Sequence, residues 1–203
     1  YLAETELIGD LCSFDGLTDR EGHIVYAASH WFSAGIMDVV QEQRVLSYHS
    51  VREIPPALED LGRRAAAAFG IRERFFHIEF FRTAPGVFVA LEVNVRPPGG
   101  ATLDMMNVAA DVDLFQWWAD VVVHDRREFA YERTYHAAFA SRRWGRAYRY
   151  DEGTLRARLG AAFVDAHDVA EAFRPVMGDR GVLLRTPSLD AIRAAIADVE
   201  AAP

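Results

Sequence analysis

Residues 75–100 read FFHIEFFRTAPGVFVALEVNVRPPGG, and their pattern is the most informative in the sequence. It contains two strand-like runs, 75–82 and 88–96, which flank a short segment with turn-forming residues. Pro85 and Gly86 lie at the centre of that segment. Because proline and glycine between two β-prone runs are typical of a hairpin loop, the sequence predicts an antiparallel hairpin.

A turn at this centre fixes which side chains of the two strands face each other. One face of the predicted hairpin is apolar and is expected to lie on a core; its facing pairs are Phe76–Val95, Ile78–Val93 and Phe80–Leu91. On the other face, Glu79 lies opposite Glu92. His77 lies opposite Asn94, and Arg96 ends the same row. We therefore expect the functional residues of the hairpin to lie on its polar face.

Facing Glu79 and Glu92 need something that offsets their repulsion, because the Cβ atoms of facing residues lie about 4.5–5.5 Å apart. One carboxyl could be protonated, Arg96 could bridge the pair, or a divalent cation could lie between them. With the amide oxygen of Asn94, the two carboxylates form an oxygen donor set that suits Mg²⁺. His77 does not indicate zinc, since no second histidine lies at a ligand-like spacing. The alternative to a functional site is that this face is simply a polar sheet surface exposed to solvent.

The loop Pro97–Gly100 directly precedes a predicted helix. Glycines before a helix expose backbone N–H groups that can hold an anion. Such a loop alone indicates only a turn. Directly after Glu92, Asn94 and Arg96, it predicts the wall that meets a phosphate or a carboxylate.

The rest of the chain predicts an α+β fold, in which helices cover the apolar face of a mainly antiparallel sheet. We expect two units, residues 1–122 and a small α/β C-terminal subdomain, 123–203. The other predicted strands are 7–17, 23–30, 134–141 and 181–186, and the predicted helices are 57–69, one broken or two separate helices over 101–123, 152–159 and 189–201.

Composition excludes several classes of function. The 203 residues are 51% hydrophobic and carry a formal charge of −8, which disfavours nucleic-acid binding. No run of 18 apolar residues predicts a membrane span, and the single cysteine, Cys12, cannot form an internal disulfide. A cytoplasmic location is therefore expected. All 22 basic residues are arginine, which excludes lysine Schiff bases and a P-loop within this chain.

Three segments, AETELIGDLCSFDG, FHIEFF and ALEVNVRPPGG, resemble the C-terminal half of the ATP-grasp superfamily of carboxylate–amine ligases. Within it, the likeness is greatest to amino-acid ligases and biotin-carboxylase-like enzymes, and it covers about residues 1–120. The resemblance implies that ATP activates a carboxylate as an acyl phosphate, which an amine then attacks. Small-molecule carboxylates and amines are therefore the expected partners.

The resemblance also implies roles for single residues. Glu79 and Glu92 would hold Mg²⁺, or Mn²⁺ in its place, against the ATP phosphates, and Asn94 would complete the metal shell. Arg96 would be the catalytic residue that stabilises negative charge on the acyl phosphate.

The nucleotide contacts implied by the resemblance come from two places. Gly99 and Gly100 would contact the cofactor. Glu4 matches the hinge position that contacts adenine or ribose, and Glu6 is the alternative for that position.

The chain also departs from the family. It has no lysine, and no glycine-rich loop lies upstream of the hinge to hold the phosphates. We expect an N-terminal domain to lie outside the chain, which alone would bind ATP poorly. Two alternatives stay open: a non-catalytic binding or assembly module of the same fold, and a retaining glycosidase that uses Glu79 and Glu92. The apolar stretch 114–123 could supply a homodimer interface.

Overall fold

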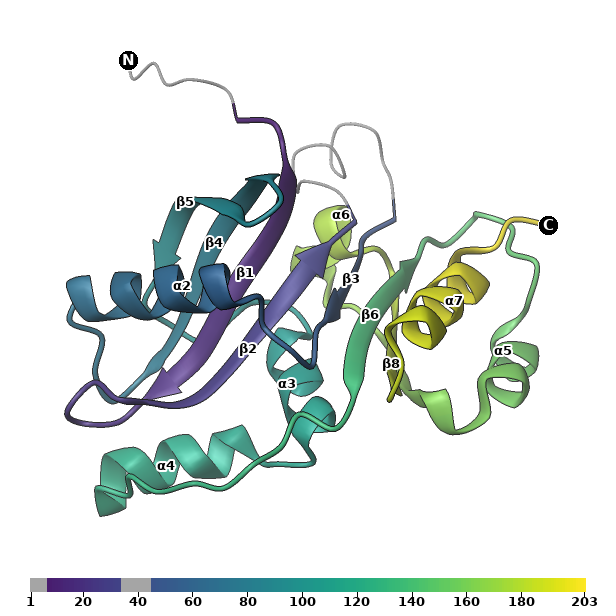
Figure 1. Ribbon diagram of the computed structural model, residues 1–203. Coiled ribbons are helices and arrows are strands. Elements are labelled where there is room, and N and C mark those ends of the chain that lie inside the picture. Colours follow the sequence, from purple (N-terminus) through teal and green to yellow (C-terminus); the bar gives the residue numbers. More distant parts are fainter. Residues whose placement is uncertain (1–6, 34–44) are drawn as a thin grey trace.

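The computed structural model describes residues 7–33 and 45–203. Within them, one eight-stranded sheet has the order β5-β4-β1-β2-β3-β6-β8-β7, and all neighbouring strands are antiparallel (Figure 1). The strands are β1 (Asp10–Thr18), β2 (Ile24–Phe32), β3 (Ser47–Ser50), β4 (Phe75–Ala84), β5 (Val87–Asn94), β6 (His136–Arg142), β7 (Phe163–Asp168) and β8 (Arg180–Thr186). The helices are α2 (Pro56–Ala68), α3 (Thr102–Ala110), α4 (Leu114–His124), α5 (Glu152–Leu159), α6 (Arg174–Met177) and α7 (Leu189–Glu200), with short 3₁₀ turns η1 (Gly160–Ala162) and η2 (Glu171–Phe173). The predicted α+β class is confirmed.

Helix α2 covers one face of the sheet over β1 and β4 (Figure 1). It begins at Pro56, where a missing N–H costs nothing, and it buries Leu58 against Phe14 of β1. A Cβ on Gly62 would lie 2.3 Å from the ring of Phe14, so the glycine allows this close approach. Helices α5 and α7 cover β6 and β8 with a second apolar cluster.

Helices α3 and α4 cover the opposite face. Their buried side chains Met106 and Leu114 pack with Leu17 of β1 and Tyr26 of β2. The hydroxyl of Tyr26 donates a hydrogen bond of 2.9 Å to the carbonyl of Met106. Both faces of the sheet are therefore packed. Phe76 of β4 belongs to the cluster under α2, and its neighbour Phe75 belongs to the cluster under α3 and α4.

The decisive hairpin has the predicted pairing in its first half. His77 pairs with Asn94, and Glu79 pairs with Glu92. The expected pair Phe80–Leu91 is wrong, because a bulge after Glu79 places Ala90 opposite Phe80. The expected pair Phe76–Val95 is also absent, since β5 ends at Asn94.

The bulge also limits the apolar face of the hairpin. On β4, Phe76, Ile78 and Phe80 are fully buried, as expected. On β5, which is the edge strand, Leu91 is 50% exposed and does not join the core. The hairpin therefore contributes to the core mainly through β4, whereas Phe88 and Val93 of β5 pack against the same cluster while only partly buried.

The sheet continues from the first predicted unit into the second. β3 pairs with β6, and β6 continues through β8 to β7. The boundary between residues 122 and 123 stays a prediction. The sequence reading missed β3 and β7, and it expected one helix or two where the structure has α3 and α4.

In the described residues, no helix is both long enough and apolar enough to pass through a membrane. Within α4, Leu114 and Val121 are buried, whereas Phe115, Val122 and Val123 are exposed. A homodimer through this helix stays a prediction.

Candidate functional site

A cavity of about 300 Å³ lies on the α3 face of the sheet, above the decisive hairpin. Six of the predicted site residues line it: Glu79, Glu92, Asn94, Arg96, Gly99 and Gly100. Glu4, together with its alternative Glu6, lies outside the described residues. The other lining residues are His77, Leu46 directly before β3, and side chains of β2, β3, α3 and the η2–α6 segment. The structure thus brings together residues that are far apart in the sequence, from Phe32 to Met177.

Glu79 and Glu92 are directly opposite in neighbouring strands, so they share one face of the sheet. The side chain of Glu79 is only 13% exposed, whereas Glu92 is exposed. No hydrogen bond or ion pair joins the Glu92 side chain to any other part of residues 7–33 and 45–203. This carboxylate is therefore free to bind a ligand.

A buried polar network lies beneath the two glutamates. Its centre is Asp15 of β1, which is fully buried and accepts hydrogen bonds from three side chains. Ser13 Oγ donates at 2.5 Å, His30 Nδ1 at 2.7 Å and His77 Nδ1 at 2.5 Å. The second ring nitrogen of His77, Nε2, lies 3.0 Å from a carboxylate oxygen of Glu79. A continuous chain of hydrogen bonds thus links Asp15 to Glu79.

This geometry makes His77 a cation. An ionised carboxylate can only accept, so the two ring nitrogens must both donate, one to Asp15 and one to Glu79. Burial lowers the pKa of His77, but the charge of Asp15 and the hydrogen bonds to Asp15 and Glu79 outweigh it and raise the pKa to about 10. Burial likewise raises the pKa of Asp15, but His77 and His30 hold this pKa well below its usual range.

The charge of His77 offsets the repulsion expected between the facing carboxylates of Glu79 and Glu92. The sequence offered a bridging Arg96, but its guanidinium donates to the carbonyl oxygen of Pro97 at 2.9 Å and forms no ion pair with Glu79 or Glu92. Instead, an imidazolium from the same strand contacts Glu79. The Arg96 bridge is therefore wrong for this state of the protein.

The sequence reading missed Asp15, Ser13 and His30 as members of the site. The sequence held a weak indication that Ser13 and Asp15 are buried. They are two residues apart in a strand, so they lie on the same face as Leu11 and Leu17, which are buried. Pairing of β1 with β4 then sets Asp15 opposite His77. That long-range register could not be read from local periodicity.

The donor set in the cavity fits a hard cation. No group of three or more His, Cys, Asp or Glu suited to a metal occurs in the part of the chain that the structure describes. The cavity offers two carboxylates and one amide oxygen, from Glu79, Glu92 and Asn94. Such oxygen ligands suit Mg²⁺, which keeps several waters and binds through one or two carboxylates together with substrate phosphates.

The glycine loop forms another wall of the cavity. Gly100 has a φ of 63°, the left-handed conformation that favours glycine. A Cβ there would also lie 2.5 Å from the terminal methyl group of Met177. Helix α3 begins two residues later, so the unpaired N–H groups of its first turn lie near the cavity.

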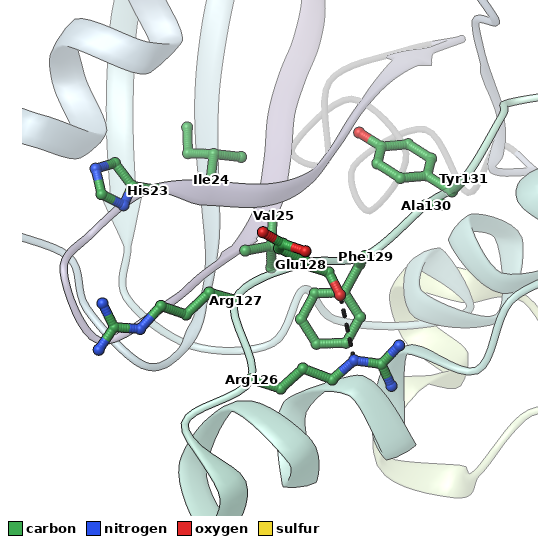
Figure 2. A pocket seen from close by; sticks show the side chains of 9 residues that line it. All are labelled: His23, Ile24, Val25, Arg126, Arg127, Glu128, Phe129, Ala130 and Tyr131. Atoms are coloured by element: carbon green, nitrogen blue, oxygen red, sulfur yellow. Dashed lines mark hydrogen bonds between the residues drawn. The ribbon is translucent and has the colours of Figure 1, made fainter.

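A larger cavity of about 660 Å³ lies elsewhere, between the β1–β2 turn and the segment after α4 (Figure 2). Its arginines are already paired: Arg126 with Asp120 at 2.9 Å, and Arg127 with Glu21 at 3.0 Å and Asp125 at 2.8 Å. The side chain of His23 at its rim is 79% exposed. This cavity therefore lacks the buried charges that mark the other one.

Comparison with known proteins shows a likeness in structure alone. No protein-family model matches the chain, and no curated protein matches it. An L-amino acid ligase from Bacillus licheniformis has 13% identity and a TM-score of 0.72, with 96% of this chain and 54% of that chain covered. The phosphoribosylaminoimidazole carboxylase ATPase subunit from Aquifex aeolicus has 14% identity and a TM-score of 0.67, with 94% and 57% covered.

A third structure was determined with bound nucleotide. The biotin carboxylase domain of the 2-oxoglutarate carboxylase from Hydrogenobacter thermophilus, in complex with MgADP, ADP and bicarbonate, has 14% identity and a TM-score of 0.57, with 92% of this chain and 44% of that chain covered. The chain thus spans about half the length of these proteins. The resemblance to the ATP-grasp superfamily is confirmed at the level of the fold.

Proposed function

We propose that this chain forms the metal-binding and acyl-phosphate-forming part of an ATP- and Mg²⁺-dependent carboxylate–amine ligase. The observation that carries the proposal is the pairing of Glu79 with Glu92 at the floor of a cavity that a glycine loop also lines. The likeness of fold to ATP-dependent ligases supports it. The rest of the catalytic unit, including the groups that hold the nucleotide phosphates, would come from outside this chain.

In this proposal Glu79, Glu92 and Asn94 would hold Mg²⁺, and Mn²⁺ could replace it. When bound, the metal neutralises charge on the ATP phosphates. His77 holds the Glu79 carboxylate through Nε2, so one metal ligand is oriented before any cation arrives. Hydrogen bonds from neighbouring side chains to the ligating groups orient the ligands of metal sites in this way.

The proposed reaction has two steps. A carboxylate oxygen of the substrate attacks the terminal phosphorus of ATP and releases ADP, which gives an acyl phosphate. An amine then attacks the acyl carbon, and phosphate leaves. Arg96, on the exposed rim of the cavity, would turn from Pro97 to stabilise the developing negative charge. Backbone N–H groups at Gly99 and Gly100 would contact the nucleotide or the transferred phosphoryl group.

One observation favours the second candidate, a non-catalytic module of the same fold. The chain contains no lysine, although lysine commonly helps to hold nucleotide phosphates. The glycosidase alternative gains no such support. It needs one carboxyl in surroundings that favour the neutral acid, but Glu79 contacts a charged histidine and Glu92 is exposed.

The test is Glu92→Gln in the full-length protein, with two measurements. We expect Mn²⁺ affinity, followed by electron paramagnetic resonance, to fall at least about tenfold, since even lost outer-shell partners cost about 10- to 100-fold. Carboxylate-dependent phosphate release from Mg-ATP should fall with it. The matched control is Glu132→Gln, an exposed glutamate away from the cavity. Unchanged Mn²⁺ affinity in the Glu92 variant would remove the metal role.

A further inference from the structure

The cavity wall that faces away from the carboxylates is apolar, and it is built from three separate parts of the chain. Its apolar and aromatic members are Phe32, Leu46, Tyr48, Phe173, Val176 and Met177. The rings of Phe32 and Tyr48 stack with centroids 5.0 Å apart at 20°. Tyr48 is buried, and its hydroxyl lies 3.3 Å from that of Thr102. The Phe32–Tyr48 part of the wall is thus packed, whereas Phe173 is 57% exposed and Val176 and Met177 are partly buried.

The segment that carries Met177 is held in place from behind. Arg143 of the loop after β6 donates to the carbonyl oxygens of Arg174 at 3.2 Å and Pro175 at 3.0 Å. On the cavity side, Met177 packs directly against Gly100. The apolar wall therefore meets the glycine loop with no side chain between them.

The charged lining residues lie on β4, on β5 and directly after β5, apart from the elements that carry the apolar members. Among the described lining residues, the charged groups are Glu79, Glu92, Arg96 and the imidazolium of His77. Because both ring nitrogens of His77 already donate to carboxylates, Arg96 is the side-chain cation among these residues that remains for an anionic substrate group. In the proposed function, Mg²⁺ would be taken up by Glu79, Glu92, Asn94 and the ATP phosphates. A second substrate carboxylate would have to lie against the apolar wall, where an unpaired charge is strongly disfavoured.

We infer that the carboxylate substrate is a monocarboxylate with an apolar body, whose apolar part lies against Phe173, Val176 and Met177. The inference rests on the proposed ligase function and names the substrate class of that same cavity. The volume of about 300 Å³ is at the small end of the range for ligand pockets. It suits a compact body such as the side chain of leucine or phenylalanine.

The experiment uses the full-length protein and four probes: L-leucine, L-phenylalanine, L-aspartate and L-glutamate. Hydroxylamine serves as a general nucleophile, because it attacks an acyl phosphate to give a hydroxamate and releases phosphate. Each turnover then converts ATP, carboxylate and hydroxylamine into ADP, phosphate and hydroxamate. We expect kcat/KM for the apolar pair to exceed that for the acidic pair by at least about tenfold, as expected for burial of a few apolar groups.

The decisive variant is Met177→Lys, which adds a cation to the apolar wall. It should lower the ratio of apolar to acidic kcat/KM at least about tenfold. Val123→Lys is the matched control, because Val123 is 69% exposed at the end of α4 and does not line the cavity. Val176→Thr, which adds a hydroxyl at similar volume, replaces Met177→Lys if that variant does not fold, and it should lower the ratio in the same direction.

Thermal shift separates failure of this inference from failure of the proposed function. If no probe gives hydroxamate but L-leucine still raises Tm in a Met177-dependent way, the ligase function fails and the apolar subsite stands. If hydroxamate forms with the acidic probes at equal or greater kcat/KM, or if Met177→Lys leaves the ratio unchanged, the apolar subsite is refuted and the ligase function stands.

Discussion

His77→Gln tests the buried ion network most directly. The substitution keeps a hydrogen-bond donor but removes the positive charge between Asp15 and Glu79. One pKa unit corresponds to about 1.4 kcal/mol. A rise from the ordinary 6.5 to about 10 therefore sets a ceiling of about 5 kcal/mol on the stabilisation by charged His77. Loss of one partner from a buried pair costs about 3–5 kcal/mol. Because Ser13 and His30 still bond Asp15, we expect a loss of about 3 kcal/mol.

The loss should depend on pH in a definite direction. The pKa of His77 is raised in the folded protein, so its stabilisation is fully present below pH 6.5 and disappears as the pH rises through about 10. The pKa of Asp15 is lowered, so its own contribution is present above 3.8 and fades only in stronger acid. The free energy of unfolding, measured in urea, should therefore differ most between wild type and variant at pH 5.5. By pH 10 the difference should fall towards about 1 kcal/mol, the value of one neutral hydrogen bond.

The measurement has two internal checks. The chain has no lysine, and wild type and variant share the same seven tyrosines, so tyrosine ionisation in alkali cancels in the difference between them. His124→Gln is the control, because His124 is exposed at the end of α4; it should change stability by no more than about 0.5–1 kcal/mol. An equally large loss for His77→Gln at pH 5.5 and pH 10 would mean that His77 is not charged in the folded protein.

Two further predictions concern packing. Gly62→Ala should lower the free energy of unfolding by up to about 2 kcal/mol, because overpacking against Phe14 costs about 1–3 kcal/mol and exceeds the roughly 1 kcal/mol helix gain of alanine. In the matched change Gly153→Ala the new Cβ meets nothing closer than 3.6 Å, so an equal loss there would rule out the steric reason. Cys12 should resist Ellman's reagent at pH 8 until urea unfolds the protein, since burial raises the pKa of its thiol to about 12; rapid labelling of the folded protein would contradict this.

Local patterns in the sequence were enough to predict the hairpin and most helices. Pro85 and Gly86 set the turn, so the pairing of Glu79 with Glu92 followed from counting along the chain. Ser188 was readable as the start of the last helix, and its side chain does accept a hydrogen bond there. These features depend on neighbours in sequence, which is why they could be predicted.

The missed features depend on distant residues or on weak patterns. β3 has only four residues, and its sequence SYHS does not alternate between apolar and polar. β7 is an edge strand, and half of its residues are polar (FVDAHD), so it carried only a weak hydrophobic signal. The role of Asp15 required knowledge that β1 lies between β2 and β4. No local rule reveals which strands become neighbours.

The candidate cavity draws its lining from positions as far apart as Phe32 and Met177. During synthesis, the acidic pair emerges from the ribosome well before Phe173, Val176 and Met177, the C-terminal part of the apolar wall. A chain stalled after β5 could already display both glutamates, but it would have no enclosure to select a substrate. Recognition by this cavity is therefore expected to appear only when the final strands join the sheet, which makes ligand binding a reporter of completed folding.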